Sequence, residues 1–357
     1  MNINYNIIIP TRPNMENLHR LLSSINQQNP KPQYIYILID KNITPQEYIY
    51  YQNILTQYKL PIKIITNTNS NFLPWKWVSY VRNFGIKASQ SEYILLLDDD
   101  TKLPEDFINQ IISANLHAYM QDIHISETFY KKEEKRKPFI LFPSVKYHNT
   151  DIIQNQWYSM MHYWMMRPEP IYANNDLKSK IRKLLFWRID NMYIKTLANS
   201  KTLANSAYSD TSKCLNTNHI YMCPSICLFG KSEIFKNNLY DERMAFVYED
   251  LDMTAKLSNN GISIYNLTNI YIEHYESPRN KIQSSFLTPE QAYNKSKNRI
   301  LFVQNNAIWA EKLLFWTIWL PGQTLRFIIF VSIFSKNKIY TIKQIIKWIK
   351  DWLFDKK

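Results

Sequence analysis

The sequence predicts an α/β fold in which a parallel or mixed β-sheet is flanked by helices. In the first 116 residues, short apolar runs alternate with segments whose apolar residues recur at helical spacing. This order is typical of strand–helix repeats and a parallel sheet. Polar residues directly follow three of the apolar runs. Because ligands bind outside the carboxyl ends of such strands, these polar residues predict a single binding site.

The expected strands are four short apolar runs. Three of them end at proline or at an aspartate, which suits buried strands. They cover residues 3–10, 34–39, 62–65 and 93–97.

Helices are expected between these runs. Leu18, Leu21, Leu22 and Ile25 lie at positions i, i+3, i+4 and i+7, which form one face of a helix. Residues 44–47, Thr-Pro-Gln-Glu, form a capping box with proline at the first helical position, so a second helix begins there. Further helices are expected over residues 75–90 and from Pro104 onward, where acidic residues in the first turn suit the helix dipole.

Composition limits the class of protein. The chain has 357 residues, 45% of them apolar, and a formal net charge of +13. Such an excess favours anionic lipid or phosphorylated substrates, and because no segment resembles a nucleic-acid module we expect no nucleic-acid partner. The cysteines are too few for a disulfide framework and are interpreted as buried, reduced thiols of a cytoplasmic protein: Cys214, Cys223 and Cys227. The N-terminus predicts no signal peptide.

The C-terminal part predicts contact with a membrane surface. A capping box at residues 288–291 begins a strongly helical region, and residues 313–334 are apolar. Pro321-Gly322 and Arg326 interrupt that run, which disfavours a bilayer crossing. Because a lysine-rich amphipathic tail follows, we expect an interfacial helix pair on an anionic leaflet. The alternative is a helix buried in the protein core.

An acidic cluster stands at the end of the fourth apolar run. Asp98-Asp99-Asp100 supplies two carboxylates separated by one residue, which suits a divalent cation that neutralises a departing diphosphate. The alternative is an acidic turn that caps a helix. Phosphate-loop and dinucleotide motifs are excluded, because position 225 is serine where the first phosphate-loop glycine must stand and no G-x-G-x-x-G occurs.

A second acidic cluster, Glu249-Asp250-Leu251-Asp252, offers a base that takes a proton from an acceptor hydroxyl. Its alternative interpretation is an ordinary acidic helix start. His274 stands at the end of another apolar run, where it is either a satisfied polar residue or a ligand of a metal or diphosphate.

These motifs, taken in order, resemble family 2 glycosyltransferases of the GT-A fold, of the type that builds bacterial cell-surface glycans. The similarity covers residues 3–116 and about 222–276. It rests on Ile-Ile-Ile-Pro-Thr-Arg-Pro at 7–13, Arg-Asn-Phe-Gly-Ile at 82–86, Leu-Leu-Leu-Asp-Asp-Asp at 95–100, Tyr-Asp-Glu at 240–242, Glu-Asp-Leu-Asp at 249–252, and His274.

The resemblance implies a role for each matching residue. It places Asp250 as the catalytic base with Glu249 beside it, and it implies single displacement with inversion at the anomeric carbon. It implies Mn²⁺ or Mg²⁺ held by Asp100, Asp98 and His274. The residues implied for the donor nucleotide and diphosphate are Pro10, Thr11, Arg12, Asp40, Arg82, Asp98 and Asp99.

Together these interpretations predict four segments. Residues 1–116 form the nucleotide-sugar-binding half, 117–221 a largely helical insertion, 222–287 the acceptor and catalytic half, and 288–357 a helical membrane-interfacial segment. We expect an enzyme that moves a sugar from a nucleotide-diphosphate sugar to a glycan or lipid-linked acceptor. We expect it in the cytoplasm, on the inner face of the cell membrane. The alternatives are an inactive nucleotide- or carbohydrate-binding relative, and a nucleotidyl- or phosphotransferase on a similar sheet.

Overall fold

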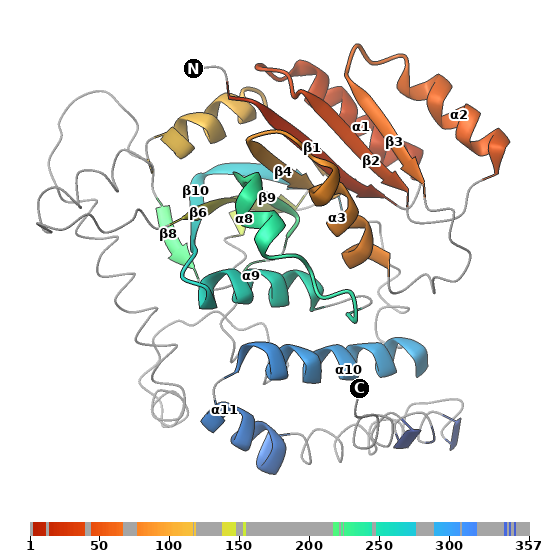
Figure 1. Cartoon of the computed structure of the whole chain (residues 1–357). Coiled ribbons are helices and arrows are strands. Elements are labelled where there is room, and N and C mark those ends of the chain that lie inside the picture. Colours follow the sequence, from red (N-terminus) through yellow and green to blue (C-terminus); the bar gives the residue numbers. More distant parts are fainter. Residues whose placement is uncertain are drawn as a thin grey trace, which may run out of the picture.

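A computed structural model of the chain places a large mixed sheet beneath and between helices (Figure 1). The structure describes residues 3–11, 14–39, 44–66, 77–116, 118, 138–147, 153–154, 217–220, 223, 225–244, 248–275, 289–307, 309–319, 339–340, 343 and 346–347. Arg12, Asp40, Cys214 and most of 313–334 lie outside these ranges.

Among the described residues the sheet has ten strands, eight of them on one path in the order β3-β2-β1-β4-β9-β6-β10-β5. β7 pairs with β6, and β8 pairs with β10. The strands are β1 (Tyr5–Thr11), β2 (Tyr34–Ile39), β3 (Ile62–Thr66), β4 (Tyr93–Leu97), β5 (Thr101–Lys102), β6 (Phe139–Tyr147), β7 (Ile153–Gln154), β8 (Thr217–Ile220), β9 (Cys227–Lys231) and β10 (Ser263–His274).

The first four strands form the parallel half of the sheet and confirm the predicted strands. β1 lies between β2 and β4 and is parallel to both. All seven of its residues are buried, as expected of a strand covered on both faces. Thr11 pairs with Ile39 at the far end of β2, so the two strands end side by side.

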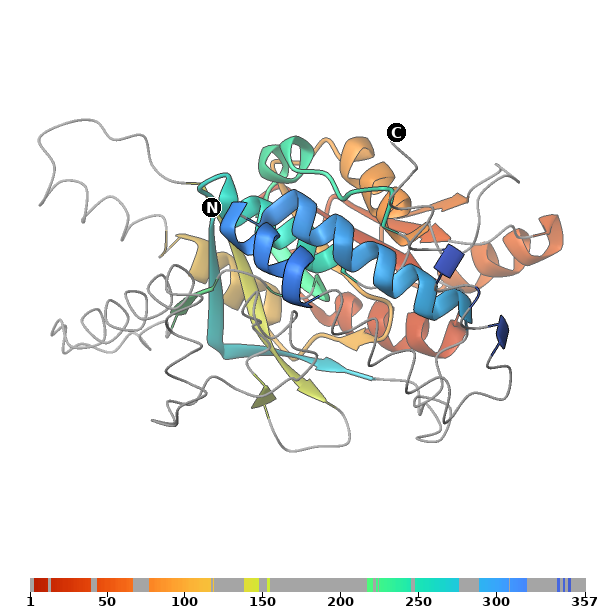
Figure 2. The ribbon, with the colours of Figure 1, turned by 90° about the horizontal axis from the view of Figure 1, so that it is seen from below.

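β9 turns the sheet from parallel to mixed, because it is antiparallel to both β4 and β6. Figure 2 shows that β10 is strongly bent along its length. The bend accompanies a register shift between Leu267 and Tyr271, opposite Pro143 of β6. A β-bulge provides such a bend, and proline, which lacks a ladder donor, is tolerated at bulges.

β6 is the longest of the strands that the sequence analysis missed, along with β5, β7, β8 and β9. It lies within residues 117–221, where a largely helical insertion was expected, yet it is a central strand of the sheet. Pro143 in the middle of its apolar run argues against a central strand when the sequence is read alone. Most other residues of that segment lie outside the described ranges, so their helical character stays a prediction.

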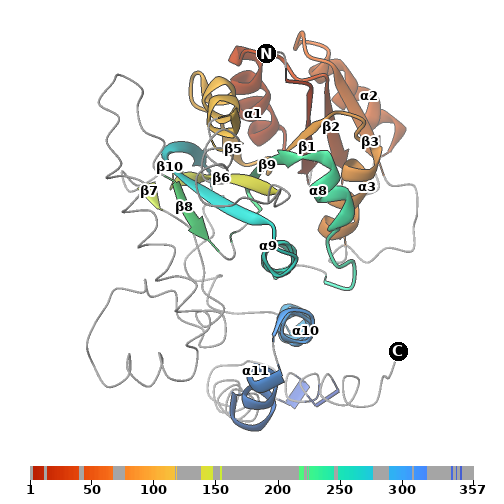
Figure 3. The same cartoon turned by 60° about the vertical axis from the view of Figure 1, so that its left-hand side comes forward.

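Helices cover both faces of the sheet and then extend away from it. Figure 3 separates α1 and the helix at residues 107–116, above the sheet in that view, from α3 and α8 below it. α9, α10 and α11 follow one below another in Figures 1 and 3. The helices are α1 (Met15–Gln27), α2 (Pro45–Leu55), α3 (Trp77–Ala88), α8 (Ser232–Asn237), α9 (Glu249–Asn259), α10 (Pro289–Asn306), α11 (Trp309–Leu314) and the π-helical turn η3 (Phe315–Trp319).

The predicted helices of the first 116 residues are confirmed. α1 presents Leu18, Leu21, Leu22 and Ile25 to the core, and α2 begins at Pro45 of the capping box. Within the residues that the structure describes, no helix combines the length and apolar character that a bilayer crossing needs.

Candidate active site

The acidic triplet is fixed by the backbone of the sheet. The Asp98 amide, one residue beyond β4, donates to the Ile226 carbonyl at 3.0 Å. The Thr101 hydroxyl closes the turn by donating to the Asp98 carbonyl at 2.7 Å. Thr101 then begins β5, which pairs antiparallel with the end of β10 and lies opposite His274. The turn therefore has sheet pairing before and after it, which leaves its carboxylates little freedom.

This pairing brings Asp100 and His274 together. Their side chains approach at 3.2 Å between His274 Nε2 and Asp100 Oδ1. The Tyr275 amide donates to the Asp100 carbonyl at 2.7 Å, which ties the two strand ends a second time. His274 is buried, and its imidazole faces the acidic turn from 174 residues further along the chain.

The first strand contributes Thr11 to the same edge. Its hydroxyl donates to Asp99 Oδ2, so the end of β1 touches the acidic turn directly. Pro10 precedes it within β1 and is buried. The register of β1 and β2 places Ile39, the neighbour of Asp40 in the sequence, beside Thr11.

Arg82 connects the two acidic clusters from α3. Its guanidinium donates to Asp98 Oδ1 at 2.7 Å and approaches Glu249 Oε1 at 3.6 Å. It also lies 5.3 Å from the centre of the Tyr240 ring, within cation–π range. Arg82 is only 5% exposed. A buried guanidinium that contacts two acidic side chains holds them in one arrangement, and removing it would leave Asp98 without its cationic partner.

α9 begins at the second acidic cluster in an unusual backbone conformation. Tyr248, the residue before the helix, has φ of 80°, the left-handed region that residues with a side chain rarely adopt. Glu249 and Asp250 follow in the first turn, where the helix dipole stabilises negative charge. Asp250 Oδ1 accepts from the Leu251 amide at 2.8 Å. Backbone strain of this kind concentrates at functional sites.

Burial affects the pKa values of the two neighbouring acids, Glu249 and Asp250. Burial, reinforced by the charge of Asp250, raises the pKa of Glu249 to about 8, although Arg82 opposes the rise. Burial also raises the pKa of Asp250, and Arg82 and backbone amides oppose that rise. Asp250 is the more exposed of the two. The raised pKa of Glu249 therefore favours its protonated form at neutral pH.

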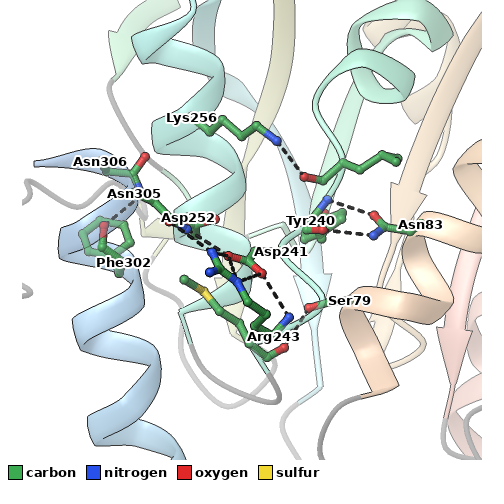
Figure 4. A network of polar contacts seen from close by, with 12 residues as sticks. Ser79, Asn83, Tyr240, Asp241, Arg243, Asp252, Lys256, Phe302, Asn305 and Asn306 are labelled. Carbon is green, nitrogen blue, oxygen red and sulfur yellow. Dashed lines mark hydrogen bonds and ion pairs between the residues drawn. The ribbon is translucent and has the colours of Figure 1, made fainter. Parts of the chain in front are cut away.

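Sequence reasoning missed the side chains that hold the loop before α9. Asn83, next to Arg82 in α3, donates to the Tyr240 carbonyl at 3.0 Å and to Glu242 Oε1 at 2.9 Å, and accepts from the Tyr240 amide at 2.9 Å. Ser79 of the same helix donates to the Met244 carbonyl at 3.0 Å (Figure 4). No pattern in the sequence signals these contacts, because they join residues more than 150 positions apart.

The structure thus gathers most of the predicted site residues. Within the described part of the chain, no group of three or more His, Cys, Asp or Glu side chains is arranged to hold a metal ion. Asp100 and His274 are paired, whereas the third expected ligand, Asp98, has an oxygen engaged by Arg82. Cys223 and Cys227 are free and buried, as expected.

Comparison with known families is consistent with this geometry. The model of the family described as glycosyl transferase family 2 matches residues 6–174. Just under half of the chain therefore matches a glycosyl transferase family 2 domain. The match includes β1, β4, the acidic triplet and β6, which lies beyond the boundary at residue 116 that the sequence analysis expected.

A curated relative of this domain comes from Staphylococcus aureus. It is poly(ribitol-phosphate) β-N-acetylglucosaminyltransferase TarP, which is 26% identical over 177 residues. The aligned part covers 49% of this chain and 51% of TarP, so the chain spans about half the length of the curated relative that it matches.

Solved structures show the same fold around the family 2 domain. The crystal structure of GalNAc-T7 with UDP, GalNAc and Mn²⁺ matches with a TM-score of 0.54 and 13% identity, over 85% of this chain and 48% of that one. Residues 1–349 of S. aureus TarS, in complex with UDP-GlcNAc, match with a TM-score of 0.49 and 15% identity, over 98% and 81% of the two chains. At 13% identity the likeness to GalNAc-T7 concerns the fold alone, which is of the GT-A kind.

Proposed function

We propose that this protein transfers a sugar from a nucleotide-diphosphate sugar to a glycan or lipid-linked acceptor of a bacterial cell surface. The observation that carries the proposal is the arrangement around Arg82. This residue joins an acidic turn at a sheet edge, suited to the donor, to an acidic helix start, suited to the acceptor. The family 2 match over the first of these regions supports the same reaction.

The residues present fit a divalent cation such as Mn²⁺ or Mg²⁺. Asp100 Oδ1 is buried, has no hydrogen-bond partner and lies beside His274 Nε2. Asp100 and His274 would hold such a cation, and phosphate oxygens of the donor would supply further ligands. When bound, it neutralises charge on the diphosphate leaving group. Asp98 stays with Arg82 and acts on the donor side of the site.

Asp250 is proposed as the general base. Its carboxylate takes the proton of the attacking hydroxyl as that oxygen bonds to the anomeric carbon and the bond to the diphosphate breaks. A single displacement of this kind inverts the anomeric configuration. Glu249, protonated at neutral pH, adds no second negative charge beside Asp250, so the donor diphosphate meets less repulsion.

The decisive experiment is an assay of nucleoside diphosphate release from a panel of nucleotide sugars, with Mn²⁺, Mg²⁺ or a chelator present. We expect release from at least one donor, stimulated by the cation and accelerated by a glycan acceptor. Release of pyrophosphate or of a nucleoside monophosphate would instead indicate a nucleotidyl- or phosphotransferase. Donor binding without turnover under all conditions would indicate an inactive relative.

The C-terminal region is proposed to contact an anionic membrane surface. Of the eight large apolar side chains that are strongly exposed in the described residues, five lie beyond α10: Trp309, Leu313, Ile339, Tyr340 and Ile346. Exposed Lys343 and Lys347 lie among the last three at helical spacing. Exposed apolar side chains interleaved with lysine fit an interface that is apolar within and anionic at its surface.

Sedimentation with neutral and anionic vesicles tests this contact. We expect the protein to sediment with anionic vesicles and to be partly released by high salt, because each lysine near such a surface contributes about 1 kcal/mol. Lys343→Glu/Lys347→Glu should abolish sedimentation. The matched pair Lys59→Glu/Lys87→Glu, also exposed, makes the same change in net charge and should not. Equal behaviour of the two variants would contradict the proposed surface.

A further inference from the structure

The end of α10 lies against the start of α9 through two facing pairs of side chains. Tyr248, the residue just before α9, and Asp252 in its first turn are linked by the Asp252 amide, which donates to the Tyr248 carbonyl at 2.8 Å. On α10, Phe302 and Asn306 are four residues apart and therefore lie on one face. The rings of Tyr248 and Phe302 are 6.0 Å apart, and Asn306 Nδ2 donates to Asp252 Oδ1 at 2.6 Å. One face of α10 thus contacts the residues on both sides of Glu249 and Asp250.

Asn305 extends this contact to the loop before α9. Its Nδ2 donates to Asp252 Oδ1 and to Asp241 Oδ2, each at 3.0 Å. Its Oδ1 accepts from Arg243 Nη2 at 3.3 Å, and Arg243 is itself paired with Asp241 (Figure 4). A single side chain therefore links the Asp241–Arg243 turn, α9 and α10.

We propose that Asn305 and Asn306 are positioning residues for the transfer reaction. They fix the start of α9 so that Asp250 faces the carboxylates of the Asp98–Asp100 turn in one orientation. The inference rests on the proposed function. The network holds the chain before the catalytic turn through Asp241 and after it through Asp252. Because Tyr248 has a strained backbone, the turn keeps its shape only while surrounding contacts impose it.

The use of neutral amides fits this role. Asp252 is 2% exposed, and burial raises its pKa to about 6, although the bonds from Asn305 and Asn306 oppose the rise. A lysine or arginine in their place would also satisfy the carboxylate. It would, however, bring a cation within one helical turn of Asp250 and weaken Asp250 as a proton acceptor. The neutral side-chain amides of Asn305 and Asn306 hold Asp252 without lowering the proton affinity of Asp250.

The test exchanges the hydrogen-bonding roles of the two side chains, Asn306 and Asp252, that meet across the contact. Asn306→Asp places two carboxylates against each other, and we expect kcat to fall at least about 10-fold while the donor Kd stays within about 2-fold, since small misplacements of a reacting group are costly. The double variant Asp252→Asn/Asn306→Asp restores an amide–carboxylate pair with its direction reversed. It should recover most of the lost kcat.

A matched control separates positioning from a general loss of stability. Asn260, at the opposite end of α9, donates to Asn238 Oδ1 at 2.7 Å. Asn260→Ala therefore removes one amide contact of the same helix, and kcat measured well below the melting temperature should stay near that of the unaltered protein. The inference is overturned if Asn260→Ala and Asn306→Asp lower kcat equally, or if the double variant does not recover.

Amide hydrogen exchange supplies a readout that does not depend on activity. We expect exchange in residues 248–257 to accelerate in Asn306→Asp, to return in the double variant and to stay unchanged near residue 250 in Asn260→Ala. Unchanged exchange in Asn306→Asp would overturn the positioning role. If the unaltered protein releases no nucleoside diphosphate from any donor, the proposed function fails, and the exchange data alone decide whether this contact orders the turn.

Discussion

The two acidic clusters of the site are held in place by different means. On the donor side, the turn at Asp98–Asp100 lies between paired strands, and main-chain hydrogen bonds to Ile226 and from Tyr275 fix its backbone. On the catalytic side, the start of α9 is held by side chains of α3 and α10 and passes through a strained Tyr248. The sheet fixes the first cluster, whereas a network of polar side chains fixes the second.

This difference means that the two clusters should respond separately to substitution. A change in a side chain of the donor turn leaves its backbone in the sheet. A change in the network around α9 alters the orientation of the catalytic turn, because no strand pairing holds it. Arg82, which contacts both clusters, is the residue through which one side influences the other.

The largest effect is expected from Asp250→Asn. Asparagine keeps the shape of the side chain but accepts no proton, so turnover should fall by roughly 10²- to 10⁴-fold, the range for loss of a general base. The donor Kd, measured by calorimetry, should stay near that of the unaltered protein, because the donor turn is untouched. Equal losses of donor affinity and turnover would place Asp250 on the nucleotide instead.

Asp100→Ala should show the opposite pattern. Loss of this carboxylate removes one of the two proposed protein ligands of the cation, which in turn binds the diphosphate. Donor affinity with Mn²⁺ should therefore fall by about 10- to 100-fold or more. In chelator, the variant and the unaltered protein should bind the donor equally. Glu105→Ala, which removes an exposed carboxylate nearby, serves as the control. If calorimetry finds unchanged affinity for Asp100→Ala with Mn²⁺, then Asp100 is not a metal ligand.

The sheet-held part of the site is the part that the sequence predicts well. Apolar runs and turn residues indicate the strands of the parallel half, and β2 and β4 begin and end at the predicted residues. Because parallel strands end at one edge, the polar residues after them are brought together by the fold itself. Thr11 at the end of β1 and Asp99 just beyond β4 therefore meet.

The network-held part could not be predicted in the same way. Asn83 lies inside α3, and Asn305 and Asn306 are the last two residues of α10, so helical periodicity registers all three only as polar positions. Their partners lie more than 50 residues away in the sequence, and no local rule of spacing connects them. β6 was missed for a related reason, since the bulge in β10 that accommodates Pro143 is a property of the neighbouring strand.

A smaller effect should appear in the pH dependence of stability. Glu249 has a folded-state pKa of about 8, raised by burial from 4.5, so the folded protein holds a proton that the unfolded chain loses in this range. The stability from this group is complete below about pH 4.5 and is lost as the pH rises through about 8. The loss approaches 1.4 kcal/mol per pH unit at most.

Glu249→Gln mimics the protonated acid and removes this dependence. The pKa values of Asp98, Asp250 and Asp252 shift in the same direction and remain in both proteins, so the difference between the two curves reports Glu249. Denaturant unfolding at pH 5 to 9 should show the variant gaining stability relative to the unaltered protein as the pH rises. Parallel curves would mean that Glu249 is ionised in the folded state.

The smallest effect is expected at the other end of α9, where backbone conformation alone is at stake. Gly261 follows the helix with φ of 79°, nearly the value of Tyr248 before it. A methyl group added at Gly261 would meet no atom within 4 Å. Gly261→Ala should therefore lower the free energy of unfolding by only about 1 kcal/mol, because alanine is less stable than glycine in the left-handed conformation. Because neither acidic cluster contacts this end, kcat and donor Kd should be unchanged. A fall in kcat would show that the catalytic turn depends on the whole of α9 and not on the network at its start, which would remove the contrast between the two clusters.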